Sequence, residues 1–338
     1  MSKQPRVAVI GAGSWGTTIA SLAAANGPTL LWARRDELAA EIEERHTNQA
    51  YLPGLDLHSE LRATSSMEEA AATADVLVMA VPSHGFREVL EQAAPHVRPW
   101  IPVVSLVKGL EPQTKLRMTQ VVEQVLPGHP AGVLTGPNLA REVMTGHAAA
   151  AVVAIPDEHL ARPLQDIFKA PGFRIYRSTD VVGAEVAGAL KNVFAIAAGM
   201  AAGLGTGDNT RALVICRAIA EMTRLGVAMG GDQLTFAGLA GVGDLLATCM
   251  SPLSRNRTVG EQLAKGRSVQ QITEEMNMVA EGIKTSSVVR ELAERYAVDL
   301  PIASEVDAVI NAGRAPQEAY AGLLRRTPST EFQGVGTR

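Results

Sequence analysis

The chain has 338 residues, more than one hydrophobic core ordinarily supports, so two domains of roughly 150 residues each are expected. Hydrophobic residues make up 46% of the chain and charged residues 20%, a composition typical of a globular protein rather than a disordered or fibrous one. The net charge of −4 provides no general attraction to nucleic acid or to an anionic membrane. These partner classes are therefore not expected, and any anionic ligand must be held by a few local cations.

Cysteine and histidine usage indicates neither a disulfide framework nor a metal site. Cys216 and Cys249 are far apart and form no C-x-x-C, and the seven histidines form no H-x-x-x-H pair. No apolar signal region precedes the first predicted strand, so we expect a cytoplasmic location. Residues 186–204 are long and apolar enough to span a membrane, but a lysine, an asparagine and three glycines within them favour a core helix. No membrane insertion is expected.

Short β-type runs alternate with helical patterns through the first half of the chain. The first units follow the βαβ order, with helical patterns at 15–27 and 36–46. Near-continuous apolar runs suit strands that are buried on both faces, so we predict an α/β fold with a parallel, doubly wound, Rossmann-like sheet. The predicted strands are residues 6–11, 29–34, 61–65, 75–81, 102–109, 131–136, 149–155 and 174–179.

After about residue 180 the β-type runs almost stop and helical patterns take over. We therefore predict an NAD(P)-binding Rossmann-like domain over 1–182 and an all-helical substrate and catalytic domain over 183–326. The polar, glycine-rich tail, 327–338, is expected to be disordered. The helical patterns of the second half, beyond the one at 185–201, are residues 211–226, 258–266, 268–276, 285–296 and 303–313.

The first predicted strand runs into a glycine-rich turn, VIGAGSWG. Gly11, Gly13 and Gly16 form G-x-G-x-x-G between a strand and a helix, where they allow a tight turn and a close approach of the backbone to a pyrophosphate. In this context the motif indicates a dinucleotide site, although a glycine-rich turn without a ligand is the alternative. Ser14 and Trp15 fill the variable positions and should line the cofactor cleft.

The end of the second predicted strand bears on the choice of dinucleotide. An NAD site usually has an acidic residue here for the ribose 2′-hydroxyl, but this chain has Arg34 and Arg35. Two guanidinium groups can hold a 2′-phosphate through bidentate bonds, so NADP(H) is preferred and NAD(H) stays open. The alternative is a solvated arginine pair. Asp36 is expected to be the N-cap of the next helix.

Two further strand ends carry polar residues where ligands bind to open α/β sheets. Lys108 lies at the end of the predicted strand at 102–109 and could face a substrate oxyanion or the nicotinamide; a lysine that reaches solvent is the alternative. Gly136 and Asn138 come directly after the run AGVLT, residues 131–135, and Asn138 could bind an anion or serve only as an N-cap.

In the helical half, one segment combines an acidic residue with a compact set of donors. Asp244 follows a glycine, and Ser254, Arg255 and Asn256 offer one delocalised cation with neutral donors, which suits a phosphate. A basic surface loop is the alternative for this segment.

Lys191 lies in the middle of the helix at 185–201, and its neighbours three and four positions away are apolar or glycine. A lysine that is partly desolvated has a lowered pKa, which would make it a better proton donor to the alkoxide formed when a ketone accepts a hydride. A lysine that reaches solvent from the edge of the core is the alternative, and the spacing does not decide between them.

These segments resemble, over nearly the whole chain, the bacterial NAD(P)-dependent glycerol-3-phosphate dehydrogenases. The resemblance is carried by ordered segments that include VIGAGSWGTTIA, YLPG, SLVKGLE, LTGPNLAREV, ALKNVFAIAAGMAAGLGTGDNTRAL and GVGDLLATCMSPLSRNRTVG. It implies a Rossmann-like domain followed by an all-helical domain. It also implies reversible reduction of dihydroxyacetone phosphate to sn-glycerol 3-phosphate for phospholipid synthesis. A homodimer is compatible with the resemblance, although nothing in the composition demands one.

The resemblance also implies roles for individual residues. Lys191 matches the proton donor and acceptor, and Lys108 matches a lysine that touches both cofactor and substrate. The matches to substrate-binding positions are Gly136, Asn138, Asp244, Ser254, Arg255 and Asn256, with Arg255 expected to serve the cofactor as well. The matches to cofactor contacts are Ser14, Trp15, Arg34, Arg35, Ala140, Val279 and Glu281. The chain departs from the family at Asn138, where Ser or Thr is common, and at Arg141, where relatives often have an acidic residue.

Two other hypotheses stay open from the sequence. One is another oxidoreductase with the same plan, of the 6-phosphogluconate or hydroxyacid dehydrogenase group; the clusters at 254–257 and 136–140 favour the glycerol-3-phosphate family. The other is a redox sensor that binds NADPH without turnover. Lys108 and Lys191 argue against it, since a sensor needs no proton donor.

Overall fold

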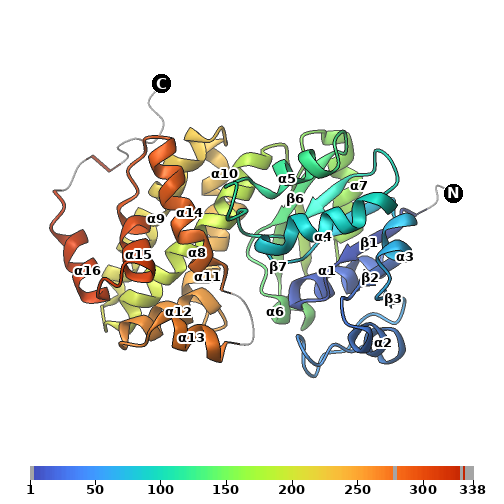
Figure 1. The fold of residues 1–338 in the computed structure, drawn as a ribbon, viewed down its shortest axis with the longest axis horizontal. Coiled ribbons are helices and arrows are strands. Elements are labelled where there is room, and N and C mark those ends of the chain that lie inside the picture. Colours follow the sequence, from blue (N-terminus) through green and yellow to red (C-terminus); the bar gives the residue numbers. More distant parts are fainter. Residues whose placement is uncertain (1–3, 277–279, 328–329, 332–338) are drawn as a thin grey trace. The chain divides into compact units, whose positions relative to one another are not determined.

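The computed structural model describes residues 4–276, 280–327 and 330–331, and it divides into two compact units (Figure 1). The first unit contains the chain up to Val107 and Leu116–Val181, and the second contains Lys108–Lys115 and the chain from Val182 onward. The segment Lys108–Lys115 therefore packs with the helical unit although it follows a strand of the sheet in the chain. The tail predicted to be disordered, 327–338, lies mostly outside the described residues.

The first unit is built on an eight-stranded sheet in the order β3-β2-β1-β4-β5-β6-β7-β8. Each strand overlaps its predicted run, which confirms the predicted strands. Their apolar runs form strands because these residues are buried against helices on both faces of the sheet. The strands are β1 (Val7–Ile10), β2 (Thr29–Trp32), β3 (Leu61–Thr64), β4 (Val76–Met79), β5 (Val103–Ser105), β6 (Ala131–Thr135), β7 (Ala149–Ala154) and β8 (Phe173–Ser178).

The prediction of a wholly parallel sheet is wrong for the last two strands. Strands β1 to β6 run parallel, but β7 pairs antiparallel with β6, with Leu134 opposite Val153, and β8 runs parallel to β7. The only helix between β6 and β7 is α6 (Ala140–Met144), which has five residues. Such a helix is about 7.5 Å long, too short to carry the chain back along the sheet as a parallel crossover requires.

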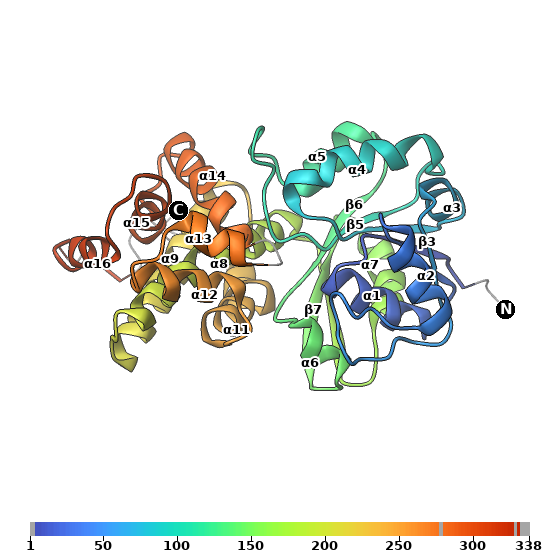
Figure 2. The same ribbon diagram turned by 60° about the horizontal axis from the view of Figure 1, so that its bottom comes forward.

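Helices cover both faces of this sheet (Figure 2). Along β1, Val7 and Val9 face one helical layer while Ala8 and Ile10 face the other, as the two-residue period of a strand requires. The first layer contains α1 (Ser14–Ala24), α2 (Asp36–Arg45), α6 and α7 (Glu158–Phe168). The second contains α3 (Met67–Ala72), α4 (Phe86–Ala93) and α5 (Met118–Val125).

The second unit is helical around α8 (Val181–Gly203), the core helix predicted from the sequence. By length and composition α8 could cross a membrane, but 94% of its apolar window is buried inside the structure. The other helices are α9 (Asp208–Ala228), α10 (Gln233–Ala237), α11 (Asp244–Met250), α12 (Arg255–Ala264), α13 (Val269–Glu275), α14 (Glu281–Arg295), α15 (Pro301–Asn311) and α16 (Pro316–Leu324). No predicted helical run corresponds to α10, α11 or α16. Helices α10 and α11 flank a π-helical turn, Leu239–Gly243.

Candidate functional site

Lys191 finds a partner from another helix. Its side chain is 7% exposed, and Nζ donates to Oδ1 of Asp244 at 2.6 Å and to Oγ1 of Thr248 at 2.8 Å. An ammonium group has three hydrogens, so these two bonds leave one N–H for a ligand. The alternative of a lysine that simply reaches solvent does not fit this burial.

Asp244 is the first residue of α11 and joins two lysines through one carboxylate. Oδ2 lies 2.8 Å from Nζ of Lys108, while Oδ1 holds Lys191. The side chain of Asp244 is 3% exposed, so this is a buried cluster of two ammonium groups and one carboxylate. Sequence reasoning placed Asp244 at the substrate, and the structure adds that it organises both lysines.

The π-helical turn sets where α11 begins. Gly243 N–H donates to the carbonyl of Gly238 at 3.1 Å, five residues back, as in a π-helix. A Cβ at Gly241 would lie 2.1 Å from the carbonyl oxygen of Phe236, so only glycine fits this close approach. The turn therefore fixes the position of Asp244 through backbone contacts that a side chain would block.

The surroundings of Lys108 lower its pKa. Burial lowers the pKa from 10.5 to about 7, the carboxylate of Asp244 opposes this shift, and the charge of Lys191 adds to it. Its ammonium group is therefore poised to gain or lose a proton near neutral pH.

A chain of amide hydrogen bonds ties four segments together beside the lysines. Asn192 Nδ2 donates to the carbonyl of Lys108 at 2.7 Å, and Asn256 Nδ2 donates to Asn192 Oδ1 at 2.9 Å. Gly282 N–H then donates to Asn256 Oδ1 at 3.0 Å. The side chain of Asn256 is thus hydrogen-bonded to Asn192 and Gly282. Its predicted role at the substrate did not include these bonds.

Sequence reasoning missed Asn192 and Thr248. Each had a local signal: Asn192 directly follows the singled-out lysine, and Thr248 lies one helical turn after Asp244, on the same face. Their partners, Lys108 and Lys191, come from distant parts of the sequence, so the bonds themselves could not be inferred from spacing.

Helices α8 and α12 approach so closely that their backbones touch. A Cβ at Gly199 would lie 2.1 Å from the carbonyl oxygen of Arg257, and one at Gly260 would lie 2.0 Å from that of Ile196. This glycine contact fixes α12 against α8 and thereby places Asn256 beside Asn192.

The remaining predicted residues of the second unit lie at helix starts. Ser254 is the N-cap of α12, and its hydroxyl accepts from Arg257 N–H at 3.3 Å. Arg255, exposed in the first turn of α12, interacts electrostatically with Glu281, the first residue of α14. Val279 lies outside the described residues.

In the first unit, the glycine-rich turn has the form that a dinucleotide needs. Gly11 has φ 119°, and a Cβ there would lie 2.7 Å from the carbonyl oxygen of Ala80. A Cβ at Gly16 would lie 2.1 Å from the carbonyl oxygen of Gly11, whereas one at Gly13 would meet no atom within 4 Å. The outer glycines therefore close the turn, and the middle one faces open space where a ligand could approach.

The turn leads into the N-terminus of α1. No side chain caps α1 at Gly13, so the helix presents its first N–H groups and its positive dipole end. Ser14 Oγ donates to the carbonyl of Tyr51 at 3.0 Å. Trp15 packs edge-on against Phe173, with ring centres 6.0 Å apart, and its buried Nε1 has no hydrogen-bond partner among the described residues. These residues fit a pyrophosphate-bearing cofactor.

Arg34 and Arg35 directly follow β2 and are both exposed. Within the part of the chain that the structure describes, neither guanidinium forms an ion pair or hydrogen bond, so both are available to an anion. The N-cap of α2 is Arg35, and Asp36 is the first helical residue, so the prediction that Asp36 caps this helix is wrong. The helix starts one residue earlier than the capping preference of aspartate suggests.

The turn after β6 brings Gly136 and Asn138 to the carboxyl end of the sheet. Gly136 has φ 137°, and a Cβ there would lie 3.0 Å from Cα of Ala151 on β7, so the antiparallel pairing requires glycine. The N-cap of α6 is Leu139, and Ala140 is the first helical residue. Asn138 therefore does not occupy the N-cap position that was its alternative role.

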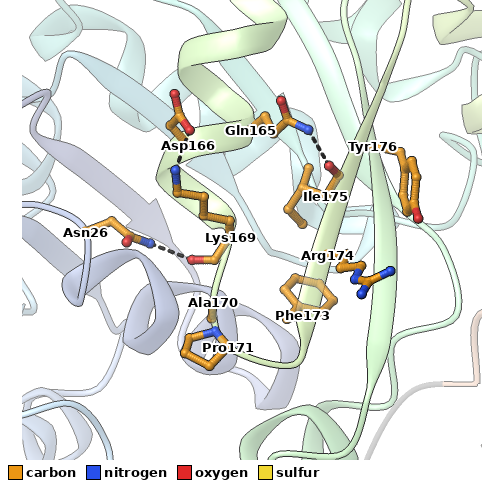
Figure 3. A pocket seen from close by; sticks show the side chains of 10 residues that line it. All are labelled: Asn26, Gln165, Asp166, Lys169, Ala170, Pro171, Phe173, Arg174, Ile175 and Tyr176. Atoms are coloured by element: carbon orange, nitrogen blue, oxygen red, sulfur yellow. Dashed lines mark hydrogen bonds and ion pairs between the residues drawn. The ribbon is translucent and has the colours of Figure 1, made fainter.

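A hollow of about 680 Å³ lies elsewhere on this unit, along α7 and β8 (Figure 3). None of the predicted site residues lines it. Several of its polar groups bond to each other: Asn26 Nδ2 donates to the carbonyl of Lys169 at 2.7 Å, and Lys169 Nζ lies 2.6 Å from Asp166 Oδ1. The first bond holds the end of α7 against the segment that follows α1, and the second lies within the end of α7 itself, so neither forms a reactive group.

Comparison with known proteins identifies the family. The model of the NAD-dependent glycerol-3-phosphate dehydrogenase N-terminus matches residues 6–161, and that of the C-terminus matches residues 180–321. The chain belongs to the NAD-dependent glycerol-3-phosphate dehydrogenase family. It is 59% identical to glycerol-3-phosphate dehydrogenase (NAD(P)+) of Mycobacterium avium, over 99% of this chain and 98% of that one. It is 55% identical to a second such protein, from Sphingopyxis alaskensis, over 96% and 98% of the two chains.

Solved structures agree with the family assignment. A crystal structure of glycerol-3-phosphate dehydrogenase from Coxiella burnetii superimposes with a TM-score of 0.91 at 32% identity, covering 96% of this chain and 99% of that one. A ketopantoate reductase from Ralstonia eutropha, with a TM-score of 0.59 at 17% identity, shares the fold alone. The family is one of oxidoreductases, which favours an enzyme over the redox-sensor hypothesis and the glycerol-3-phosphate group over other dehydrogenases with the same plan.

Proposed function

We propose that this chain catalyses the reversible reduction of dihydroxyacetone phosphate to sn-glycerol 3-phosphate with NADP(H) or NAD(H). The family assignment supports the reaction, and the single structural observation that carries the mechanism is the buried Lys108–Asp244–Lys191 cluster. We propose further that the product supplies glycerophospholipid synthesis in the cytoplasm and that the enzyme acts as a homodimer.

The turn of Gly11, Gly13 and Gly16 would hold the pyrophosphate of the cofactor at the N-terminus of α1. Arg34 and Arg35 would bind a 2′-phosphate, which favours NADP(H). When bound, the nicotinamide supplies or accepts the hydride. We assign the remaining cofactor contacts to Ser14, Trp15, Lys108, Ala140, Arg255, Val279 and Glu281.

Lys191 acts as the proton donor for reduction. Two of the three hydrogens on Nζ bond to Asp244 and Thr248, so the third is left to bond to the substrate. As the carbonyl carbon gains a hydride, the oxygen becomes an alkoxide, and the proton moves to it from Nζ of Lys191. In the oxidation direction the neutral amine takes the hydroxyl proton.

Lys108 stabilises negative charge on the same substrate. When it is protonated, the cluster has two ammonium groups against one carboxylate, so it carries one net positive charge that suits a phosphate ester and a developing alkoxide. Asp244 holds both lysines and keeps their separation fixed. The residues we assign to substrate binding with them are Gly136, Asn138, Ser254, Arg255 and Asn256.

The first experiment is a spectrophotometric assay of NADPH oxidation on addition of dihydroxyacetone phosphate. Parallel reactions contain NADH in place of NADPH, or unphosphorylated dihydroxyacetone in place of the substrate. Rapid oxidation that requires the phosphate supports the proposed reaction, and a faster rate with NADPH at low cofactor concentration supports the arginine assignment. Absence of oxidation by a folded protein that binds NADPH would contradict the substrate assignment.

A further inference from the structure

Residues 47–57 form a closed loop against the dinucleotide turn. The loop ends meet, because Thr47 bridges to Asp56 and Leu57 N–H donates to the carbonyl of His46 at 2.8 Å. A loop of this length with adjoining ends is an Ω-loop, a compact type that is frequently functional. Leu52 is 2% exposed and anchors it in the core of the first unit. We call residues 47–57 the clasp.

Asn48 joins the clasp to the turn from a fully buried position. Its side chain is 0% exposed, and Nδ2 donates to the carbonyl oxygen of Ala12 at 3.0 Å and to Oγ1 of Thr17 at 2.9 Å. Its Oδ1 accepts from Tyr51 N–H at 3.2 Å. Since the carbonyl of Ala12 can only accept, the amide nitrogen must face it, and each of the two amide hydrogens has one acceptor.

This arrangement controls the direction of a backbone donor. The carbonyl of Ala12 and the N–H of Gly13 belong to one planar peptide, and the described chain has no cis peptide bonds, so the two groups point in opposite directions. The bond from Asn48 therefore turns Gly13 N–H away from the clasp. Gly13 N–H donates to no other described residue, and Gly13 faces open space.

Two further bonds fasten the clasp. Ser14 Oγ donates to the carbonyl of Tyr51 at 3.0 Å, at the first residue of α1. Arg141 Nη1 donates to the carbonyl of Pro53 at 3.0 Å, from the helix that follows the Gly136 turn. Arg141 thus holds the outer end of the clasp.

We propose that Asn48 is a positioning residue for the cofactor: it sets the Ala12–Gly13 peptide so that Gly13 N–H is directed at the pyrophosphate. The inference rests on the proposed dinucleotide site. It assigns to Asn48 an effect on binding of the pyrophosphate alone, whereas Arg34 and Arg35 would bind the 2′-phosphate at the adenosine end of the cofactor.

The test measures binding by calorimetry and does not depend on turnover. NADPH contains the pyrophosphate, and adenosine 2′-monophosphate has the 2′-phosphate but lacks the pyrophosphate. Asn48→Asp keeps the size of the side chain but replaces the donor facing the carbonyl of Ala12 with an acceptor. We expect it to weaken NADPH binding by about tenfold to a hundredfold while the affinity for adenosine 2′-monophosphate changes by less than about twofold.

Gln49→Glu is the matched control, because it is the same amide-to-acid change at an exposed neighbour in the clasp. It retains the acceptor for Gly54 N–H and should leave both affinities within about twofold of wild type. Unchanged NADPH affinity in Asn48→Asp, or equal losses for the two ligands, would overturn the proposal, since equal losses indicate a merely structural role.

A second variant keeps the inference testable if Asn48→Asp does not fold. Thr17→Val removes one acceptor of the Asn48 amide without changing the size of a buried side chain. If Asn48→Asp does not fold, Thr17→Val should still weaken NADPH selectively, and unchanged NADPH affinity would overturn the inference. Wild-type protein that fails to bind NADPH would instead overturn the dinucleotide site itself, so the two failures are distinguishable.

Discussion

Oδ1 of Asp244 lies 2.6 Å from Nζ of Lys191, although the two residues are 53 positions apart in the sequence. Their side chains are 3% and 7% exposed, so the ion pair is buried. A buried pair contributes little net stability when complete, but removal of one partner leaves a charge that the interior cannot solvate. Substitutions of Lys191 and of Asp244 should therefore have different effects, since only the loss of Lys191 also removes the proposed proton donor.

Lys191→Ala should abolish most turnover while leaving NADPH binding nearly intact. Loss of a general acid reduces kcat by roughly 10² to 10⁴, and the dinucleotide turn lies in the other unit of the chain. Steady-state rates with dihydroxyacetone phosphate and the NADPH dissociation constant check both halves of this prediction. A variant with near-normal turnover would refute the role of Lys191 as the proton donor.

Asp244→Asn should reduce both activity and stability. The variant keeps its shape but removes the carboxylate that both Lys108 and Lys191 contact, which is expected to lower the free energy of unfolding by about 3–5 kcal/mol. The loss should be larger at pH 6 than at pH 10, because buried ammonium groups that have lost this carboxylate can be neutralised at high pH. Denaturant unfolding at the two pH values measures this.

The control for Asp244→Asn is the same change at Asp208, whose side chain is 91% exposed in its pair with Arg211. Exposed pairs contribute less than about 1 kcal/mol, so Asp208→Asn should be nearly neutral at both pH values. If the two variants lose equal stability, or if the loss in Asp244→Asn does not depend on pH, the buried-cluster interpretation fails.

Substrate affinity should depend on the protonation of Lys108. Its pKa of about 7 means that the ammonium form is lost as the pH rises through 7, so KM for dihydroxyacetone phosphate should rise above that pH, by at most about tenfold per unit.

Because the pKa of Lys108 in the folded state lies below 10.5, this group also makes the folded state more stable as the pH rises from 7 to 10.5.

Lys108→Arg keeps the positive charge throughout this range, so the rise of KM should disappear in the variant. Titration of the substrate phosphate is common to both proteins and cancels when their KM values are compared at each pH. Parallel KM profiles for wild type and Lys108→Arg would show that Lys108 is not the titrating group.

Neutral residues in place of Arg34 and Arg35 should weaken NADPH much more than NADH. The two cofactors differ only in the 2′-phosphate, and the exposed guanidinium groups are available to bind it. Dissociation constants for both cofactors with the Arg34→Gln/Arg35→Gln variant decide the question. Equal losses for the two cofactors would mean that the arginines do not recognise the 2′-phosphate.

Gly260→Ala should separate α12 from α8. A Cβ at this position would lie 2.0 Å from the carbonyl oxygen of Ile196, so backbone must move, and the expected destabilisation is about 1–3 kcal/mol or more. Because Asn256 lies on the same helix, kcat should fall as well. Gly207→Ala is the control, since no atom lies within 4 Å of the added methyl group; a similar loss there would contradict the packing argument.

The sequence by itself determined the features that depend on short-range patterns. Apolar runs located all eight strands, and the glycine spacing after β1 located the dinucleotide turn, because strand burial and turn conformation are local requirements. The apolar neighbours of Lys191 likewise showed that it has no partner on its own helix. The last two strands fit the same pattern, but pattern alone does not give strand direction, and the prediction of a wholly parallel sheet was wrong there.

Only the tertiary structure decided which residues meet. The pairing of Lys191 with Asp244 depends on a π-helical turn that starts α11, and the contact between Asn192 and Asn256 depends on the glycine contact between α8 and α12. Asn48 reaches the turn through the folding of the clasp. The physical reason is the same in each case: a side-chain bond across distant segments exists only where backbone packing brings its two ends within about 3 Å, and no local period encodes that distance.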